Sequence, residues 1–325
     1  MVDDRATLRA RYKALRKRIL SLTPFIRRSR HERALYRIDK YLQLERKAHE
    51  ALGYLFFSAP SLASTAHVRV RSLRLSAAVD ELCFFVTHAP TASLKPHVID
   101  HIEALLKANV AVVLVANTDV DLSALQIPSE LEARLSGVVV RENVGYDFAA
   151  WSHVYSIIDP TRVRRRLYLV NDSIIGPLDH VAYNNMLERV RKSQADLVGL
   201  TCNPDPHEHL QSFYLVFNER VLRSPIFDKF MRNVVNMPRK ESVVTSYELW
   251  LTPYLLRNGF TAEALFPNIA TYAPPTRNDT LSHWRELMDA GFPFIKSAVL
   301  TESKEADEAR RILPGRYTAS AARKP

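Results

Sequence analysis

Hydrophobic and polar positions follow two different periods along residues 80–260. Short, nearly continuous apolar runs are typical of strands covered on both faces, and they predict strands over 81–87, 110–116, 137–140, 167–170, 196–200 and 213–217. Between them, apolar residues at helical spacing predict helices over 94–108, 128–135, 148–158, 181–192, 219–233 and 246–258. This alternation predicts the α/β class, with a Rossmann-type, parallel or mixed sheet flanked by helices. Such sheets bind ligands at the carboxyl ends of their strands, so the residues after each strand form the candidate site.

The first 50 residues have a different pattern and most of the net charge. Of the formal net charge of +10, this segment carries +9, from 15 Lys and Arg against 6 Asp and Glu. Apolar positions at spacings of three and four predict basic amphipathic helices, which together form an N-terminal arm over 1–60. Such an arm is typical of peripheral contact with an anionic membrane; a solvated hairpin on the main domain and a dimerisation element are the alternatives. No nucleic-acid module accompanies the charge, so nucleic acid is not an expected partner.

The rest of the composition indicates a globular protein. Hydrophobic residues make up 47% of the 325 residues and charged residues 25%, which is sufficient for a packed core. Cys83 and Cys202 lie in apolar, strand-like segments and are predicted to be buried thiols, which excludes a disulfide scaffold. No apolar run reaches the roughly 18–20 residues of a membrane span, and the N-terminus does not resemble a secretory signal. We therefore expect the protein to lie in the cytoplasm, either free or peripherally bound to the inner face of the cytoplasmic membrane.

The chain is expected to divide into three parts. The arm over 1–60 precedes a main domain over 68–300, and the charged segment 301–325, which lacks periodicity, is expected to be a loosely ordered tail.

Polar residues follow the first predicted strands. His88 comes after the run 81–87, and Asn117, Thr118 and Asp119 come after 110–116. In a doubly wound fold these positions can contact a nucleotide base and ribose. Capping of the loops by Asn, Thr and Asp is the structural alternative.

A second group of polar residues lies between the strand 137–140 and the next helix. It consists of Arg141, Asn143, Gly145, Tyr146 and Asp147. Gly145 allows a positive φ or a close approach of the backbone, and Asp147 can serve as the N-cap of the helix that begins at residue 148. Capping accounts for Asp147 alone, so the other residues of the group are predicted to face a ligand.

The third group is Asn171-Asp172-Ser173, directly after the strand 167–170. An acidic residue at a strand end can hold Mg²⁺ or Mn²⁺ against the diphosphate of a nucleotide sugar, so Asp172 is the candidate metal ligand. Asp172 is the only carboxylate of this group, and the side chains of Asn171 and Ser173 are weak oxygen ligands. An Asx turn that ends the strand is the structural alternative.

Candidates for the acceptor side come from two later segments. Glu248 lies near the start of the helix 246–258 and can deprotonate a hydroxyl group, although a carboxylate in a first helical turn is also favoured by the macrodipole. Tyr247 beside it and Ser212 are candidates to contact the acceptor, as are His209 and Gln211 in the segment 203–211, which is expected to be a mobile loop.

Five blocks in this order resemble the rhamnan synthesis protein F family, glycosyltransferases of bacterial cell-surface polysaccharide assembly. The blocks are RENVGYDFAAW (141–151), YLVNDSIIGPL (168–178), LQSFYLVFNERVLRSPIFDKF (210–230), YELWLTPYLLRNGF (247–260) and WRELMDAGFPFIKSAVL (284–300). The resemblance implies a GT-A-like fold, a nucleotide-sugar donor such as dTDP-L-rhamnose, and a growing or lipid-linked glycan as acceptor. It assigns Asn143, Gly145 and Asp147 to the donor site, Asp172 to the metal or diphosphate, and Gln211, Ser212 and Glu248 to the acceptor side.

Two functions remain open from the sequence. In the first, an inverting glycosyltransferase, Glu248 is the base and Asp172 stabilises the leaving nucleoside diphosphate. In the second, a non-catalytic protein binds a nucleotide sugar or glycan within a polysaccharide assembly complex. A nucleotide-dependent oxidoreductase is excluded, because no Gly-x-Gly-x-x-Gly follows the first strand.

Overall fold

The computed structural model describes residues 43–44, 67–75, 78–205, 207–267, 278–303 and 305–317. The predicted basic arm, apart from Gln43 and Leu44, and residues 318–325 lie outside the described residues. Within the described part, no helix is both long enough and apolar enough to cross a bilayer.

Nine described strands form the main sheet, in the order β1-β4-β3-β2-β5-β9-β7-β10 with β8 beside β7. Their bounds are Val68–Leu73 (β1), Val79–Ala89 (β2), Ala111–Thr118 (β3), Gly137–Glu142 (β4), Val163–Asn171 (β5), Leu197–Asn203 (β7), His209–Leu210 (β8), Tyr214–Asn218 (β9) and Ala262–Phe266 (β10). Strands β4, β3, β2 and β5 are parallel, whereas β1 and β9 run antiparallel to their neighbours. The predicted α/β fold with a mixed sheet is confirmed.

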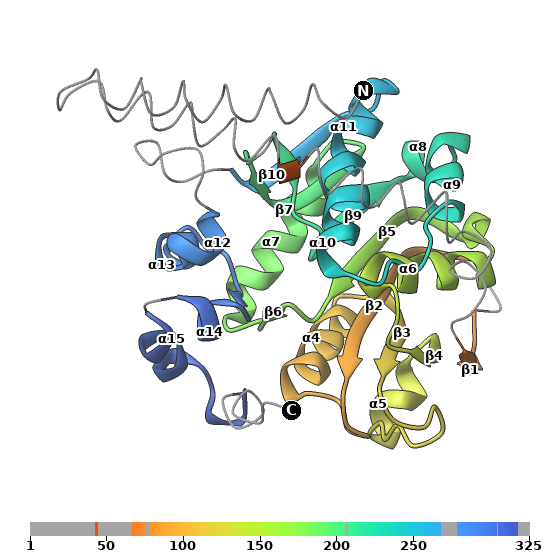
Figure 1. Ribbon diagram of the computed structural model, residues 1–325, viewed down its shortest axis with the longest axis horizontal. Coiled ribbons are helices and arrows are strands. Elements are labelled where there is room, and N and C mark those ends of the chain that lie inside the picture. The colour runs from red at the N-terminus through yellow and green to blue at the C-terminus, as the bar shows by residue number, and fades with distance from the viewer. Residues whose placement is uncertain are drawn as a thin grey trace, which may run out of the picture.

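Helices cover both faces of this sheet, so its central strands are apolar on both sides (Figure 1). Along β2, Cys83 and Phe85 face one core and Leu82, Phe84 and Val86 the other. The first core is covered by α4 (Pro96–Lys107), α5 (Ser129–Arg134) and α7 (His180–Lys192). The second is covered by α6 (Tyr146–Ile157), α8 (Glu219–Leu222), α9 (Pro225–Arg232) and α11 (Leu249–Arg257). Both cysteines are buried and neither is in a disulfide, as predicted.

The strand order reverses beside β2. The chain passes from β2 outward to β3 and β4, and then returns to place β5 on the other side of β2. Parallel sheets have a crevice at such a reversal, outside the carboxyl ends of the two strands. Here those ends carry Thr87 and His88 on β2 and Asn171 and Asp172 on β5 and its following turn.

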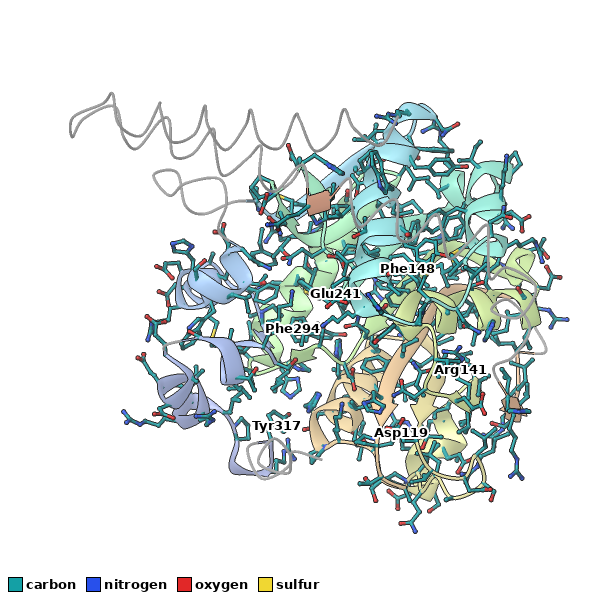
Figure 2. All side chains as sticks on the ribbon, viewed as in Figure 1. Asp119, Arg141, Phe148, Glu241, Phe294 and Tyr317 are labelled. Atoms are coloured by element: carbon teal, nitrogen blue, oxygen red, sulfur yellow. The ribbon has the colours of Figure 1, made fainter. Side chains whose placement is uncertain are left out.

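The C-terminal part of the chain forms a smaller unit against this crevice. It consists of β11 (Ile295–Lys296) and helices α12 (Asp279–Ser282), α13 (Trp284–Asp289), α14 (Val299–Glu302) and α15 (Ala306–Ile312), and β11 forms a two-stranded sheet with β6 (Ile174–Ile175) from the middle of the chain. A third apolar cluster holds it together. The expectation of a loosely ordered tail is wrong for residues 305–317, because Ala309, Leu313 and Tyr317 are buried in or beside that cluster. Figure 2 shows Tyr317 near α4, where it contacts the His97 ring.

Two predicted helices differ from the observed ones. The helix predicted over 219–233 is interrupted at Ser224-Pro225, where proline cannot continue the hydrogen-bond ladder; Ser224 instead caps α9 by accepting from the Phe227 amide. The helix predicted over 246–258 begins earlier, with α10 (Lys240–Val243) and a π-helical turn (Val244–Glu248) directly before α11.

Candidate functional site

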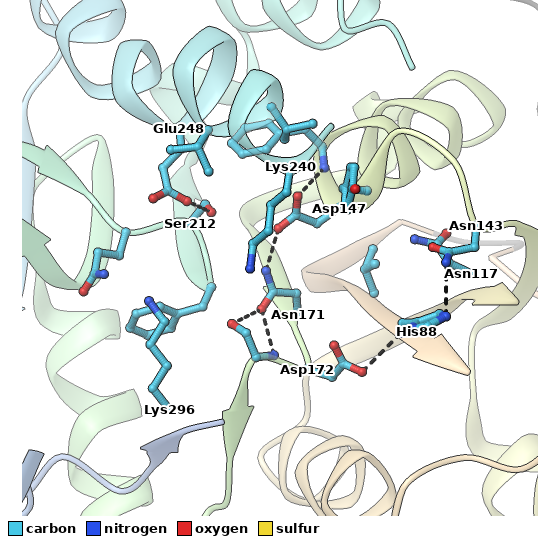
Figure 3. A pocket seen from close by; sticks show the side chains of 18 residues that line it. His88, Asn117, Asn143, Asp147, Asn171, Asp172, Ser212, Lys240, Glu248 and Lys296 are labelled. Carbon is cyan, nitrogen blue, oxygen red and sulfur yellow. Dashed lines mark hydrogen bonds between the residues drawn. The ribbon is translucent and has the colours of Figure 1, made fainter. Parts of the chain in front are cut away.

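A cavity of about 500 Å³ lies at the carboxyl ends of β2, β3, β4 and β5, at the reversal of strand order (Figure 3). Its size is typical of a small-molecule site. The lining combines polar side chains with an apolar wall: Val86, His88, Asn117, Asn143, Tyr146, Asp147, Phe148, Asn171, Asp172, Ser173, Gln211, Ser212, Phe213, Lys240, Val243, Val244, Glu248 and Lys296. Most of the predicted site residues therefore meet in one place, because parallel strands bring their carboxyl ends to one edge.

One end of the cavity is lined by His88 and Asn117, in the last residues of β2 and β3, and by Asn143 directly after β4. His88 Nε2 lies 2.6 Å from Asp119 Oδ2, and the Asn143 amide donates to Asp119 Oδ1 at 2.9 Å. Burial raises the pKa of Asp119, but the hydrogen bonds from His88 and Asn143 outweigh it and hold the pKa below its usual value. Asn117 is buried at the floor. This end offers hydrogen-bonding groups of the kind that contact a base or ribose.

Arg141 does not face the cavity, so the prediction that it contacts a ligand is wrong. Its side chain is fully buried and donates to the Asn117 side chain, the Val144 carbonyl and the Asn236 side chain. Burial lowers the pKa of Arg141 to about 10. Arg141 therefore links the ends of β3 and β4 to the segment before α10. Its hydrogen bond to the Asn117 side chain positions that residue, which lines the cavity.

The backbone before α6 is left-handed at two successive residues. Gly145 has φ 73° as predicted, and a side chain there would meet Asn236 and Ala149 at 2.5 and 2.6 Å. Tyr146, which lines the cavity, has φ 58°. A bulky residue in this region is strained, and such strain is concentrated at ligand sites. Gly145, and not Asp147, is the N-cap of α6, so the predicted capping role of Asp147 is wrong.

Asp147 is instead part of the cavity wall. Its carboxylate accepts hydrogen bonds from the Phe148 amide at 3.0 Å and from the Asn171 side chain at 2.7 Å. Burial, helped by the charge of Glu248, raises the pKa of Asp147 to about 6. Asn171 in turn accepts from the amide and hydroxyl of Ser173, which is the predicted Asx turn.

Asp172 is held by a cation of the protein itself. Its Oδ2 atom accepts from Lys95 Nζ at 2.7 Å, from the Thr87 hydroxyl at 2.6 Å and from the His88 amide at 3.1 Å. Burial of the carboxyl group favours a higher pKa, but Lys95 and Thr87 outweigh it and keep the pKa of Asp172 below its usual value. Asp172 is therefore an ionised side chain that ties α4 and β2 to the turn after β5.

These residues do not fit a site for Mg²⁺ or Mn²⁺. A divalent cation needs several oxygen ligands, usually including one or two carboxylates that are not already neutralised. The Asp172 carboxylate is paired with Lys95, whose ammonium group would repel a second cation, and its neighbours are an amide and a hydroxyl. Among the described residues, no group of three His, Cys, Asp or Glu side chains could hold a metal ion.

Glu248 lies on the opposite wall of the cavity from His88 (Figure 3). It accepts a hydrogen bond from the Ser212 hydroxyl, and its Oε1 atom lies 3.9 Å from His209 Nε2. Glu248 ends the π-helical turn in the middle of a helical stretch, so a first-turn position does not account for it. Turns of this kind occur frequently at functional sites.

A second cavity of about 360 Å³ adjoins the first at Glu248. Its lining is mainly polar and acidic: Leu44, Asn203, Asp205, His209, Lys240, Glu241, Val244, Thr245, Glu248 and Leu249. Lys240, Val244 and Glu248 border both cavities. Glu248 is thus accessible from both cavities. This geometry suits a reaction between one ligand in the first cavity and another in the second.

The other residues predicted to contact the acceptor differ in where the structure places them. Gln211 lines the first cavity and is fixed by the Thr201 hydroxyl and Asn278. His209 is a buried residue of β8, so the expectation of a mobile loop is wrong at this position. Tyr247 lines neither cavity and packs against Phe148, so its predicted contact with the acceptor is wrong.

The sequence patterns missed two cations of the first cavity, Lys240 and Lys296. Lys240 is the first residue of α10, and Lys296 ends β11. The Lys296 ammonium group lies 5.5 Å from the centre of the Phe213 ring. Neither lysine follows a predicted strand, and the only signal was that Lys296 belongs to the block 284–300.

A family model described as rhamnan synthesis protein F matches residues 112–316, well over half of the chain. The chain belongs to this family. Membership of the rhamnan synthesis protein F family indicates a role in rhamnan or polysaccharide synthesis, and it agrees with the resemblance of the five sequence blocks.

Relatives of this rhamnan synthesis protein F member carry names that do not describe a reaction. The uncharacterised protein y4gN of Sinorhizobium fredii is 28% identical over 174 residues, which are 51% of this chain and 43% of that protein. The virulence protein VirA of Vibrio anguillarum is 26% identical over 212 residues, 56% of this chain and 67% of VirA. The match thus spans less than half the length of y4gN and about two thirds of VirA.

The region shared with the family contains most of the cavity. Asp147, Asn171, Lys240, Glu248 and Lys296 lie within the matched residues. Thr87, His88 and Lys95, which hold Asp172, precede them. The rhamnan synthesis protein F region therefore depends on β2 for a complete site.

Proposed function

We propose that this protein is a glycosyltransferase with a GT-A-like fold. It moves a sugar from a nucleotide-activated donor, with dTDP-L-rhamnose as the first candidate, to a hydroxyl group of a growing cell-surface polysaccharide or lipid-linked glycan. The observation that carries this proposal is the position of Glu248 between two adjoining cavities, the first of which lies at the reversal of strand order. Membership of a polysaccharide synthesis family supports the same reaction.

The donor is proposed to lie along the first cavity. His88, Asn117 and Asn143 are at one end and suit the nucleoside, while Ser212 and Glu248 are at the other (Figure 3). The sugar then lies against Gln211 and the Phe213 ring, near Glu248. The acceptor glycan enters through the second cavity, where Asp205, Glu241 and Asn203 supply hydrogen-bond acceptors and donors for sugar hydroxyl groups.

Glu248 is proposed to be the general base of an inverting transfer. The acceptor oxygen forms a bond to the anomeric carbon while the bond from that carbon to the diphosphate oxygen breaks, and the leaving diphosphate keeps the electron pair. The hydroxyl proton passes to Glu248, whose orientation is fixed by Ser212 and whose charge is close to the His209 ring. A positioned carboxylate of this kind typically contributes 10²–10⁴-fold to the rate.

The direct test uses purified protein, dTDP-L-rhamnose and a glycan acceptor, with release of dTDP and formation of product as readouts. Glu248→Gln is expected to lower transfer by about 10²–10⁴-fold while dTDP binding stays within a few-fold of wild type. Glu188→Gln, at an exposed position of α7, is the matched control and is expected to be fully active. Undiminished transfer by Glu248→Gln would rule out the base. Binding of the donor by wild type without any turnover would favour the non-catalytic alternative.

The basic arm over residues 1–50 is proposed to hold the enzyme on the anionic inner face of the cytoplasmic membrane, where a lipid-linked acceptor would be available. Its charge of +9 supports this. Pelleting with vesicles that contain phosphatidylglycerol, with and without residues 1–50, tests the idea. Equal pelleting of the two forms would contradict it.

A further inference from the structure

His209 is fixed beside Glu248 by the segment that carries it. The ring of His207 donates from Nε2 to the Leu249 carbonyl at 2.6 Å, and Leu249 directly follows Glu248 in the chain. On the other side of His209, the amide of the next residue donates to the Thr252 hydroxyl at 3.1 Å. Both flanks of His209 are therefore tied to the helix that begins after Glu248.

The backbone contact of the His209 ring determines which nitrogen carries its hydrogen. Nδ1 lies 2.8 Å from the His207 carbonyl oxygen. A carbonyl oxygen can only accept, so Nδ1 donates, and the neutral ring has a lone pair at Nε2. Burial lowers the pKa of His209 below its usual value, although the His207 carbonyl and the charge of Glu248 oppose this effect. The ring is therefore mainly neutral near pH 7.

The Nε2 lone pair faces one oxygen of the Glu248 carboxylate. The Ser212 hydroxyl donates to Glu248 Oε2, and Oε1 lies 3.9 Å from His209 Nε2 (Figure 3 shows the bond to Ser212). Neither Oε1 of the carboxylate nor Nε2 of the neutral ring can donate, so the two atoms stay beyond hydrogen-bond distance. A proton added to Oε1 changes this, because the carboxylic acid can then donate to Nε2 and the pair can close.

Other titratable groups near the ring come from its own segment and from the walls of the second cavity, which the ring also lines. They are Asp205, His207, Lys240 and Glu241. The charge of Asp205 favours the protonated ring and that of His207 disfavours it, and both effects are smaller than the effect of Glu248. Glu248 is thus the charged neighbour that influences this ring most.

We propose that His209 is the positioning residue of the general base, and that its Nε2 atom accepts a hydrogen bond from Glu248 once Glu248 has removed the proton of the acceptor hydroxyl. This rests on the proposed function for the role of Glu248. As the acceptor oxygen bonds to the anomeric carbon, its proton moves to Glu248 Oε1 and is held between Oε1 and Nε2. After the product leaves, the proton passes to water through the second cavity. The hydrogen bond forms only as the proton moves, so it stabilises the transition state more than the bound substrates.

Transfer from dTDP-L-rhamnose to a glycan acceptor by His209→Ala tests the proposal. We expect kcat to fall roughly 10- to 100-fold, while the KM values and dTDP binding stay within about twofold of wild type. Added imidazole is expected to restore much of the lost kcat, because it supplies a basic nitrogen. Pyrazole, which has the same size and is far less basic, is expected to restore little. His180→Ala, at an exposed position of α7, is the matched control and is expected to be fully active.

The double variant shows whether His209 acts through Glu248. If it does, Glu248→Gln with His209→Ala is expected to be no slower than Glu248→Gln alone, because the hydrogen bond requires the carboxyl group. A merely structural effect of the alanine would lower the rate of both backgrounds by the same factor.

A second measurement needs neither transfer nor a change at His209. Nitrogen NMR of protein labelled at histidine follows the protonation of the His209 ring with pH in wild type and in Glu248→Gln. The negative charge of Glu248 favours the protonated ring, so His209 is expected to gain its proton at a lower pH in Glu248→Gln.

Four results would overturn the proposal: undiminished transfer by His209→Ala, equal rescue by imidazole and pyrazole, a raised acceptor KM with unchanged kcat, or the same His209 titration in wild type and Glu248→Gln. Failure of the proposed function gives a different pattern. Transfer that needs Glu248 but not His209 would retain the glycosyltransferase and reject the role of His209. A His209 titration that responds to Glu248→Gln, without transfer by wild type to any acceptor, would retain the pair and reject the glycosyltransferase.

Discussion

Asp172 and Lys95 form the ion pair at the centre of the crevice, with exposed side-chain fractions of 16% and 29%. Removal of one partner leaves the other charge poorly solvated. Asp172→Asn and Lys95→Met are each expected to lower the free energy of unfolding by about 1–3 kcal/mol, and the double variant by less than the sum, with a coupling of about 1–2 kcal/mol. Urea unfolding of the four proteins measures this coupling. Strictly additive losses would show that the pair contributes little.

Asp147 gives the protein a specific dependence of stability on pH. Its pKa is raised from 3.8 to about 6 in the folded state, by burial and by the charge of Glu248. Between these values the folded state binds more protons than the unfolded state, so the free energy of unfolding falls as the pH rises from about 4 to 6. Relative to Asp147→Asn, which lacks this titration, wild type is expected to lose on the order of 1–2 kcal/mol over that interval. Parallel profiles for the two proteins, from urea unfolding at each pH, would contradict the raised pKa.

The position of a site residue was predictable from the sequence where the course of the backbone alone determines it. Asn171 and Asp172 follow a buried strand, and every parallel strand ends at the same edge of the sheet. Arg141 and Tyr247 were predicted wrongly, because a local pattern does not show whether a side chain turns toward the cavity or into the core. Lys240 was missed because it comes from a helix start with no strand before it.

At the scale of elements, Gly145 controls how β4 passes into α6. Alanine there must adopt φ 73° and place its Cβ 2.6 Å from Ala149 Cβ. Gly145→Ala is expected to destabilise the protein by about 3–4 kcal/mol, from the left-handed backbone and the overlap together. Gly291→Ala is the matched control, because Gly291 has φ 89° with nothing within 4 Å of an added Cβ; we expect about 1–2 kcal/mol. Equal losses in thermal or urea unfolding would show that the overlap is relieved without cost.

Among the strands, buried ones were predictable from the sequence and an exposed one was not. Strands β2, β3 and β5 are apolar on both faces and were identified from that pattern. Strand β1 was missed because it is an edge strand, mostly exposed, with arginines in its sequence VRVRSL. The break between α8 and α9 depends on Pro225, which removes a hydrogen-bond donor within an otherwise helical pattern.

At the scale of the whole molecule, Tyr317 joins the C-terminal unit to the main domain. It is 2% exposed, donates its hydroxyl to Asp100 and contacts the His97 ring of α4. Tyr317→Ala is expected to lower the free energy of unfolding by about 2–4 kcal/mol and the melting temperature by roughly 5–12 °C. Tyr317→Phe keeps the ring and is expected to cost only about 1 kcal/mol, from the lost hydrogen bond. If both variants melted like wild type, the two parts would be independent in stability.

The position of β2 in the sheet has a practical consequence for fragments of this chain. The family match begins at residue 112, within β3, yet β2 lies between β3 and β5. A fragment cut to 112–316 would therefore have two unpaired inner strand edges, which invite aggregation. Recombinant expression of the family region should begin before Val79. Proteolysis is expected to release a soluble core only when cleavage leaves this strand in place.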